Sequence, residues 1–325
     1  MPIVHHRRPS LASYLIWVAA RLLLKPFFVF APMNRLTYFV VDVFERLAER
    51  NRLARSVAIE RVELGGRRAD LIMAKGPTGG DTDTAVLYLH GGAFMSCGPG
   101  THRSIGASLA KGLGVPVFVL DYRQLPEAGV GTAVHDGFEA YRELLGQRGF
   151  RHVVVAGDSA GGFLTVKLAE LARLNNLPSP PAIALLSPLL DLDIGERADR
   201  TSRYDAYLSK RQLDVLGPMF GWGPIPFTGA RRALDLDPAV FPPTIVITAE
   251  KELVEPDALE LVETLDGAGQ RVVLHSYPWQ VHAFSVPLRH REGRESVRLV
   301  IDFLDEAITT VHHETTDRDQ QTEAS

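Results

Sequence analysis

The sequence has almost no cysteine, since Cys97 is the only one in 325 residues. A single cysteine excludes an internal disulfide, and it also excludes a zinc site built on several thiolates. The fold must therefore be stabilised by its hydrophobic core, and hydrophobic residues make up 46% of the chain. One cysteine agrees with a cytoplasmic location, which we expect. No motif requires a metal or an organic cofactor, and we expect none.

Positive charge does not exceed negative charge. Lysine and arginine total 35 residues and aspartate and glutamate total 39, which gives a net charge of -4. No helical segment concentrates lysine and arginine, so the basic surface that nucleic-acid binding requires is missing. We therefore expect no nucleic-acid partner. The sequence does not indicate an oligomeric state.

Long hydrophobic runs are missing as well. The apolar run at residues 11–20 is shorter than the roughly 20 residues that a transmembrane helix needs, and charged residues follow it. Apolar residues at helical spacing predict an amphipathic helix instead. They are Leu11, Tyr14, Leu15, Val18 and Leu22. A cleaved signal sequence remains an alternative, as does membrane-surface contact through residues 11–32.

The order of the predicted elements divides the chain into segments. A second amphipathic pattern occupies residues 36–47. Because two helices alone bury little apolar surface, we expect residues 1–54 to form an N-terminal helical cap on a main domain at residues 55–310. Residues 193–236 interrupt the pattern of that domain and are predicted to be a cap insertion. The polar residues 311–325 are predicted to be a disordered tail.

From residue 85 onward, apolar runs typical of strands alternate with helical patterns. Such runs lie at residues 115–120, 153–156, 182–186 and 244–248. Near-continuous valine, isoleucine and leucine indicate strands that are buried on both faces, and parallel strands require helical crossovers between them. We predict an α/β fold with a mostly parallel central sheet flanked by helices.

Ser159 lies in a Gly-x-Ser-x-Gly motif with Gly157 and Gly161, directly after a predicted strand and before a predicted helix. A nucleophilic serine requires this context, because a sharp turn exposes the hydroxyl and the glycines let the chain double back. The following helix directs its N–H groups at developing negative charge. A glycine-rich turn without a catalytic role is the alternative. The two flanking elements favour Ser159 as a nucleophile.

Gly91 and Gly92 directly follow the predicted strand at residues 85–89. Acyl transfer passes through a tetrahedral oxyanion, which preorganised backbone N–H groups stabilise. Small residues let the backbone approach that oxygen closely. A plain turn would also explain two glycines, but the serine motif further along favours an oxyanion loop. We expect the N–H groups of Gly91, Gly92 and Ala160 to form the oxyanion hole.

Several motifs together resemble the hormone-sensitive-lipase-like group of carboxylesterases, and they occur in the order that this group has. They lie at residues 90–94, 121–123, 126–127, 157–162 and 282–284. The resemblance implies an α/β-hydrolase fold with a cap and the hydrolysis of carboxylic esters. Ala93 departs from it, because the group usually has a third glycine there. Gln124 and Leu125 replace the usual Leu-Ala, beside a segment expected to orient loops rather than react.

The resemblance also implies an acidic residue that orients the catalytic histidine. Glu252 follows the predicted strand at residues 244–248 and occupies the place where the group carries an aspartate. A glutamate can fill this role, because the acid only fixes the imidazole tautomer and stabilises the imidazolium. Glu250, Glu255 and Asp257 lie in the same cluster and remain alternatives.

His282 is the predicted general base among 11 histidines. It lies in a loop after the last predicted strand, as the order serine, acid, histidine of this fold requires. His275 lies within that strand, His290 is flanked by arginines, and His135 precedes the acid. Position along the chain therefore selects His282.

These residues predict a serine hydrolase that cleaves carboxylic esters, and the resemblance implies substrates of short to medium acyl chain. His282 would deprotonate Ser159, an acyl-enzyme would form, and water would release the acid. The expected partner is a small-molecule or lipid-like ester. An amidase or deacetylase with the same residues remains an alternative, as does a non-catalytic ligand-binding receptor of the same fold. The presence of both residues argues against the receptor.

Overall fold

The computed structural model describes residues 2–30, 56–75, 83–193, 199–287 and 290–323, together with Phe39, Val43, Glu45 and Leu47. Nine strands of this part of the chain form one sheet, in the order β1-β9-β8-β7-β6-β4-β5-β3-β2. The strands are β1 (Ile3–His5), β2 (Val57–Leu64), β3 (Arg67–Ala74), β4 (Thr84–Leu89), β5 (Val117–Leu120), β6 (His152–Asp158), β7 (Ile183–Leu186), β8 (Thr244–Ala249) and β9 (Val272–Tyr277). Neighbouring strands are parallel except where β3 pairs with β2 and β5. The predicted α/β fold with a mostly parallel sheet is confirmed.

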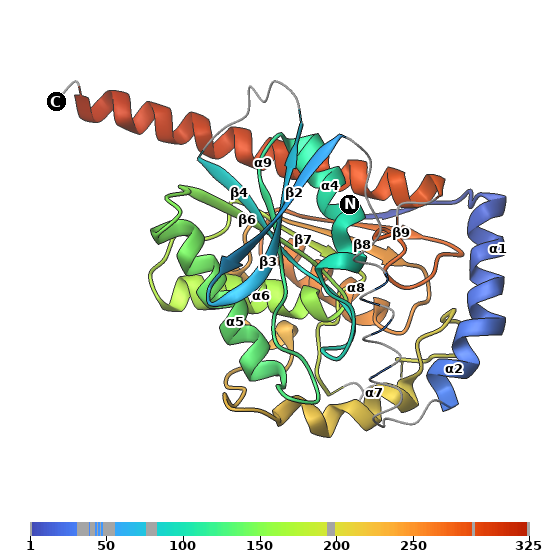
Figure 1. Ribbon diagram of the computed structural model, residues 1–325. Coiled ribbons are helices and arrows are strands. Elements are labelled where there is room, and N and C mark those ends of the chain that lie inside the picture. Colours follow the sequence, from blue (N-terminus) through green and yellow to red (C-terminus); the bar gives the residue numbers. More distant parts are fainter. Residues whose placement is uncertain are drawn as a thin grey trace.

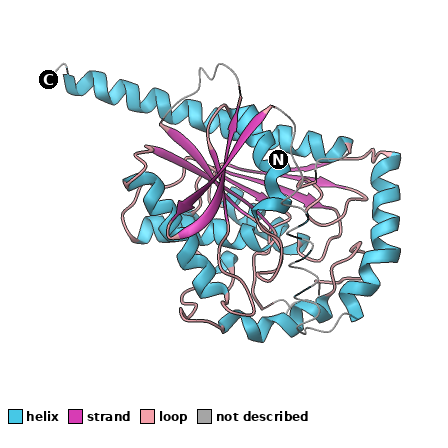
Figure 2. Cartoon of the chain, viewed as in Figure 1, coloured by secondary structure: helices cyan, strands magenta, loops and turns pink. Residues whose placement is uncertain are grey.

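Helices cover both faces of this sheet (Figures 1 and 2). The helices that cover the sheet are α4 (Pro99–Leu113), α5 (Val130–Gly146), α6 (Ala160–Leu174), α8 (Glu255–Gly267) and α9 (Arg291–Glu323). The helices α1 (Leu11–Ala19), α2 (Lys25–Phe30) and α7 (Lys210–Leu216) lie at the periphery of the molecule. Leu87 and Val155 pack toward α5, α6 and α8, whereas Val86 and Val154 pack toward α4 and α9. Successive residues of one strand thus enter two different cores, which explains the continuous apolar runs.

The first residues of the chain belong to the sheet and not to the predicted cap. β1 pairs in parallel with β9, with Ile3 opposite Leu274 and His5 opposite Ser276. An edge strand of three residues, followed by a second histidine, has no alternation long enough to reveal it in the sequence. The cap prediction for residues 1–54 was wrong for this strand.

The N-terminal helix is present, but its apolar face points away from the protein. Leu11, Leu15 and Leu22 are exposed, whereas Ser13 is buried. A π-helical turn, Ala20–Leu24, joins α1 to α2. None of the helices in the described part of the chain is long and apolar enough to cross a membrane. The predicted second helix, at residues 36–47, lies outside the described residues except for four helical positions.

The C-terminal segment is helical where a disordered tail was predicted from residue 311. α9 continues to Glu323. His312 still contacts the sheet, because its ring lies 3.0 Å from the Thr84 hydroxyl and near the ring of His152. Polar composition excludes a packed core but not a helix, because glutamate, glutamine and arginine all favour helical backbone.

The predicted insertion at residues 193–236 leaves the sheet after β7 and returns before β8. An isolated antiparallel bridge between Asp191 and Arg232 joins its two ends. α7 lies within it and is close to α2, at the bottom of the view in Figure 1. The insertion and α2 therefore meet.

A buried ion pair joins the sheet to α4. Arg103 Nε lies 2.7 Å from Asp70 Oδ2, and Asp70 has no exposed surface. An ion pair in such surroundings is costly to break, because the remaining charge stays buried.

We expect Asp70→Ala to lower the free energy of unfolding by about 3–5 kcal/mol. Urea denaturation followed by circular dichroism measures the change. Glu139→Ala is the matched control, because it removes the carboxylate of the exposed Arg142–Glu139 pair and should cost less than about 1 kcal/mol. Equal losses of unfolding free energy in the two variants would contradict a stabilising role for the buried Asp70–Arg103 pair.

Candidate active site

Ser159 lies on the sharp turn between β6 and α6. Its φ of 50° and ψ of −118° are strained for a residue with a side chain. Backbone hydrogen bonds hold this turn, because the Ser159 N–H donates to Leu186 O and the Ser159 carbonyl accepts from Leu189 N–H, both at 2.9 Å. The neighbouring strand β7 and the residues after it therefore support the strained geometry.

The glycines around Ser159 are required by close backbone approach. A Cβ atom on Gly161 would lie 1.9 Å from the carbonyl oxygen of Leu89, at the end of β4. A Cβ atom on Gly157 would lie 2.4 Å from Gly161 O. Neither contact is tolerable, so the Gly-x-Ser-x-Gly pattern follows from the tight crossing of the turn and β4.

His282 connects Ser159 and Glu252 in one hydrogen-bonded chain. Its Nε2 lies 2.8 Å from Ser159 Oγ, and its Nδ1 lies 2.8 Å from Glu252 Oε2. Glu252 follows β8 and His282 follows β9, so all three side chains lie at the carboxyl edge of the parallel sheet. Residues 123 positions apart in sequence are thus brought into contact.

The surroundings of His282 in this hydrogen-bonded chain favour the charged form of its imidazole. Burial lowers the pKa of His282, but the charge and hydrogen bond of Glu252 outweigh burial, and the net pKa is raised above its usual value. Glu252 also accepts the Ala249 N–H (3.1 Å). These contacts fix one carboxylate oxygen on the backbone and leave the other for the imidazole.

The other three acids of the cluster have different partners. Asp257 Oδ1 lies 2.8 Å from Arg200 Nη2 in a buried ion pair. Glu255 accepts the Ser276 hydroxyl at 2.6 Å, and Glu250 lies on the surface, 3.5 Å from Lys251 Nζ. Among the four candidates, Glu252 is the one that contacts His282.

The oxyanion loop differs from expectation at one residue. The N–H of Gly91 donates to Asp158 Oδ1 at 3.0 Å, so it is already committed. The N–H groups of Gly92 and Ala93 have no acceptor within the described part of the chain. Both residues have positive φ, 115° and 55°. The sequence could not reveal this, because spacing does not specify the direction of an amide.

Asp158 is buried and joins three elements beside Ser159. Besides Gly91 N–H, it accepts the Tyr88 hydroxyl of β4 at 2.9 Å and lies 3.1 Å from His102 Nε2 of α4. Burial opposes its charge, but His102 and these donors lower the pKa of Asp158 below its usual value. A carboxylate directly before Ser159 thus holds the loop of Gly91 and Gly92 in place.

Tyr122 and His90 complete the support of this loop. The Tyr122 hydroxyl donates to the His90 carbonyl at 2.6 Å, and the two rings stack with centroids 4.2 Å apart. The Arg123 guanidinium binds Asp136 through two hydrogen bonds. The segment at residues 121–123 therefore supports the loop that carries Gly91 and Gly92, through the contact of Tyr122 with His90.

Sequence reasoning missed three residues that hold the loops of the acid and the histidine. Asp205 Oδ2 accepts the Leu253 N–H (2.9 Å), and the Tyr207 hydroxyl donates to the His282 carbonyl (3.0 Å). Ser187 Oγ accepts the Ala283 N–H (3.0 Å). Ser187 follows a parallel strand, which is a usable signal. Asp205 and Tyr207 lie in the insertion, where the sequence carries no signal that would identify them.

The arrangement suits nucleophilic acyl transfer. A serine hydroxyl contacts an imidazole, a carboxylate orients that imidazole, and uncommitted backbone N–H groups lie on the neighbouring loop. In the residues that the structure describes, no three histidine, cysteine, aspartate or glutamate side chains gather that could hold a metal ion.

Comparisons with known proteins agree with this chemistry. A family profile described as alpha/beta hydrolase fold matches residues 86–286. The chain is 30% identical over 326 residues to the carboxylesterase/phospholipase LipF of Mycobacterium tuberculosis, covering 94% of this chain and 85% of that protein. It is 33% identical over 263 residues to the esterase LipU of the same organism, covering 76% and 86%.

Solved structures give the same assignment. An esterase from the bacterial hormone-sensitive lipase family has a TM-score of 0.79 and 26% identity, covering 93% of this chain and 100% of that one. Sequence motifs, fold and relatives point to a single family. The chain belongs to the hormone-sensitive-lipase-like group of carboxylesterases in the α/β-hydrolase superfamily, and the protein is a hydrolase that acts on esters.

Proposed function

We propose that the protein cleaves carboxylic esters through an acyl-enzyme on Ser159, with His282 as general base and Glu252 as the orienting acid. The continuous hydrogen-bonded chain from Ser159 Oγ to Glu252 Oε2 carries this proposal. His282 takes the hydroxyl proton as Ser159 attacks the carbonyl, and it returns that proton to the leaving alcohol. Water activated by His282 then releases the acid.

We propose that the oxyanion hole consists of the N–H groups of Gly92, Ala93 and Ala160. The Gly91 N–H, which the sequence suggested, is replaced because it binds Asp158. Ala160 is the first residue of α6, so its N–H is uncommitted within the helix. Each donor aimed at the developing oxyanion contributes about 3–4 kcal/mol.

The proposed substrate has a short to medium acyl chain. The family resemblance supports this range, and the relatives LipF, a carboxylesterase/phospholipase, and LipU, an esterase, support an ester substrate. Ala93, in place of a third glycine, adds a methyl group to the oxyanion loop, which would limit bulky alcohol groups.

Ser159→Ala should abolish hydrolysis of p-nitrophenyl butyrate, with kcat at least about 10⁴-fold lower, because no other group can form the acyl-enzyme. Circular dichroism should remain unchanged. Ser108→Ala, on α4 where the hydroxyl donates to Ser104 O, is the matched control and should retain full activity. Activity of Ser159→Ala close to the wild-type level would overturn the proposal.

The pH dependence of kcat/KM should have an acid limb with its midpoint above pH 6.5, since the pKa of His282 is raised and only the neutral imidazole accepts the serine proton. Glu252→Gln removes the carboxylate that raises this pKa. The limb should move to lower pH, with kcat about 10²- to 10⁴-fold lower.

Glu250→Gln is the control for this pH experiment. It is the same substitution two residues earlier, on an exposed side chain that pairs with Lys251. Its pH profile should match that of the wild type. If Glu252→Gln retains the wild-type acid limb, another acid orients His282.

A series of p-nitrophenyl esters should give the highest kcat/KM with acyl chains of short to medium length. The p-nitroanilides of the same acids test the amidase alternative, because they change only the leaving group. We expect ester hydrolysis to exceed anilide hydrolysis at every chain length. Faster cleavage of the anilides would identify an amidase, and a maximum at the longest chains would contradict the proposed acyl range.

A further inference from the structure

The segment from α1 to α2 has its charged side chains turned toward the protein. Arg21 and Lys25 are the only charged residues between Leu11 and Phe30. Arg21 donates to Asp205 O at 2.7 Å, and Lys25 donates to the carbonyls of Asp205 and Ser202. Both cations thus bind backbone carbonyls of the insertion. In an ordinary surface helix, such charged side chains would point to solvent.

The outer face of the same segment is apolar along its whole length. Its exposed large side chains are Leu11, Tyr14, Leu15, Ile16, Leu22, Leu23, Leu24, Phe27 and Phe30. α1 and α2 run along the right-hand periphery of the molecule in Figure 1. A continuous exposed apolar face of this kind marks an interaction surface, because soluble surfaces do not normally gather so many large apolar groups. This face, from Leu11 to Phe30, is called the apolar face below.

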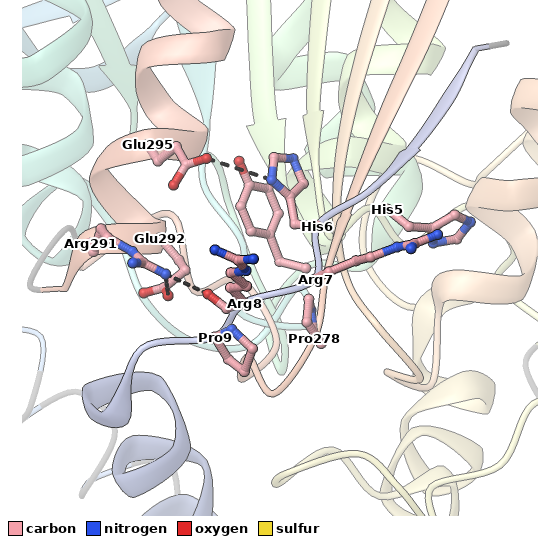
Figure 3. A pocket seen from close by; sticks show the side chains of 10 residues that line it. His5, His6, Arg7, Arg8, Pro9, Pro278, Arg291, Glu292 and Glu295 are labelled. Atoms are coloured by element: carbon pink, nitrogen blue, oxygen red, sulfur yellow. Dashed lines mark hydrogen bonds and ion pairs between the residues drawn. The ribbon is translucent and has the colours of Figure 1, made fainter.

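A cavity with charges of both signs adjoins the start of α1. Its volume is about 400 Å³, and residues 5–9 line it together with Arg291, Glu292 and Glu295. Glu292 pairs with Arg291, and Glu295 lies near His6. Figure 3 shows Arg8 and Arg291 extending into this cavity, whereas Arg7 extends the other way beside His5. Within the described part of the chain, no carboxylate pairs with the guanidinium groups of Arg7 and Arg8. The two exposed arginines therefore place positive charge at one end of the apolar face.

Aromatic side chains lie at the same end. Tyr14 and Trp17 both contact Trp279 edge to face, with ring centroids 5.0 and 5.1 Å apart. Tyr14 and Trp279 are partly open to solvent. Tyrosine, tryptophan and arginine beside an apolar surface are the pattern of a membrane interface, where rings and cations lie at the level of the lipid headgroups.

We propose that the apolar face is a docking surface for a lipid membrane with anionic headgroups. The leucine and phenylalanine side chains enter the acyl region, and the arginines at residues 7 and 8 bind headgroup phosphates. Charge complementarity favours lipid over a second copy of the chain, because a self-association surface needs no unpaired cations at its rim. The helix lies on the membrane and does not span it, in agreement with its length.

This surface is coupled to the catalytic loops. Arg21 and Lys25 bind the carbonyl of Asp205, and the carboxylate of Asp205 holds Leu253, the residue after Glu252. Trp279 precedes His282 by three residues. A membrane on the apolar face would therefore lie beside the active-site loops, where esters dissolved in lipid are present.

Co-flotation of the full chain with vesicles tests the proposal. The wild type should float with vesicles of phosphatidylcholine and phosphatidylglycerol, and more weakly at high salt. Leu23→Gln, at a side chain 74% exposed, should lower the partition coefficient about tenfold, since it removes one leucine from the acyl region. Leu174→Gln is the matched control, because Leu174 is 69% exposed at the end of α6. It should bind like the wild type.

A second variant tests the cations. Arg8→Gln should weaken binding to the anionic vesicles about fivefold and leave the weaker binding to pure phosphatidylcholine unchanged. Equal loss on both vesicles would contradict a role in headgroup binding.

The proposal is overturned if the wild type does not float, or if Leu23→Gln and Leu174→Gln float equally. It is also overturned if light scattering finds a dimer that Leu23→Gln dissociates, because the apolar face would then bind a second copy. Hydrolysis of p-nitrophenyl butyrate in solution should be the same in all these variants. Ser159→Ala should float like the wild type, so failure of the proposed catalytic residues would leave the docking result intact.

Discussion

The carboxylate of Asp158 connects the parts of the protein on which the active site depends. It is buried directly before Ser159 and accepts hydrogen bonds from β4 and from the oxyanion loop, with His102 of α4 as its counter-charge. A buried carboxylate is stable only when donors and a cation surround it. That requirement fixes the loop of Gly91 and Gly92 relative to the turn at Ser159, so the N–H donors of this loop keep a constant position relative to Ser159 Oγ.

A second set of contacts positions the other half of the site. Asp205 and Tyr207, both in the insertion, hold the loops that carry Glu252 and His282. The backbone carbonyl of Asp205 also accepts hydrogen bonds from Arg21 and Lys25 of the N-terminal segment. The insertion therefore supports the loops that carry Glu252 and His282, and the raised pKa of His282 depends on loops that the insertion restrains.

The sequence predicted the sheet, the serine turn and the position of His282, because each rests on local pattern and chain order. Ser159 needed only its flanking strand, helix and glycines. The choice of Glu252 among four acids required three-dimensional contacts, because all four acids lie within residues 250–257. The sequence could not show that the Gly91 N–H is bound to Asp158, because glycine spacing indicates a close approach but does not tell which amide already has an acceptor.

The N-terminal segment shows a different limit of sequence reasoning. Periodicity identified the apolar stripe of α1 correctly, but periodicity does not show whether such a stripe packs on the protein or faces outward. Leu11, Leu15 and Leu22 face outward because Arg21 and Lys25 find carbonyl acceptors on the protein side. β1 was missed because three edge residues held by one neighbour carry no periodic signal.

The bridge between Asp191 and Arg232 holds the two ends of the insertion together. Between these ends, Leu213, Leu216 and Phe220 are buried in the same hydrophobic core as strand β6 and helix α6. The insertion is therefore packed into the main domain, and loss of a large apolar side chain from it would leave a cavity in the core of the whole domain.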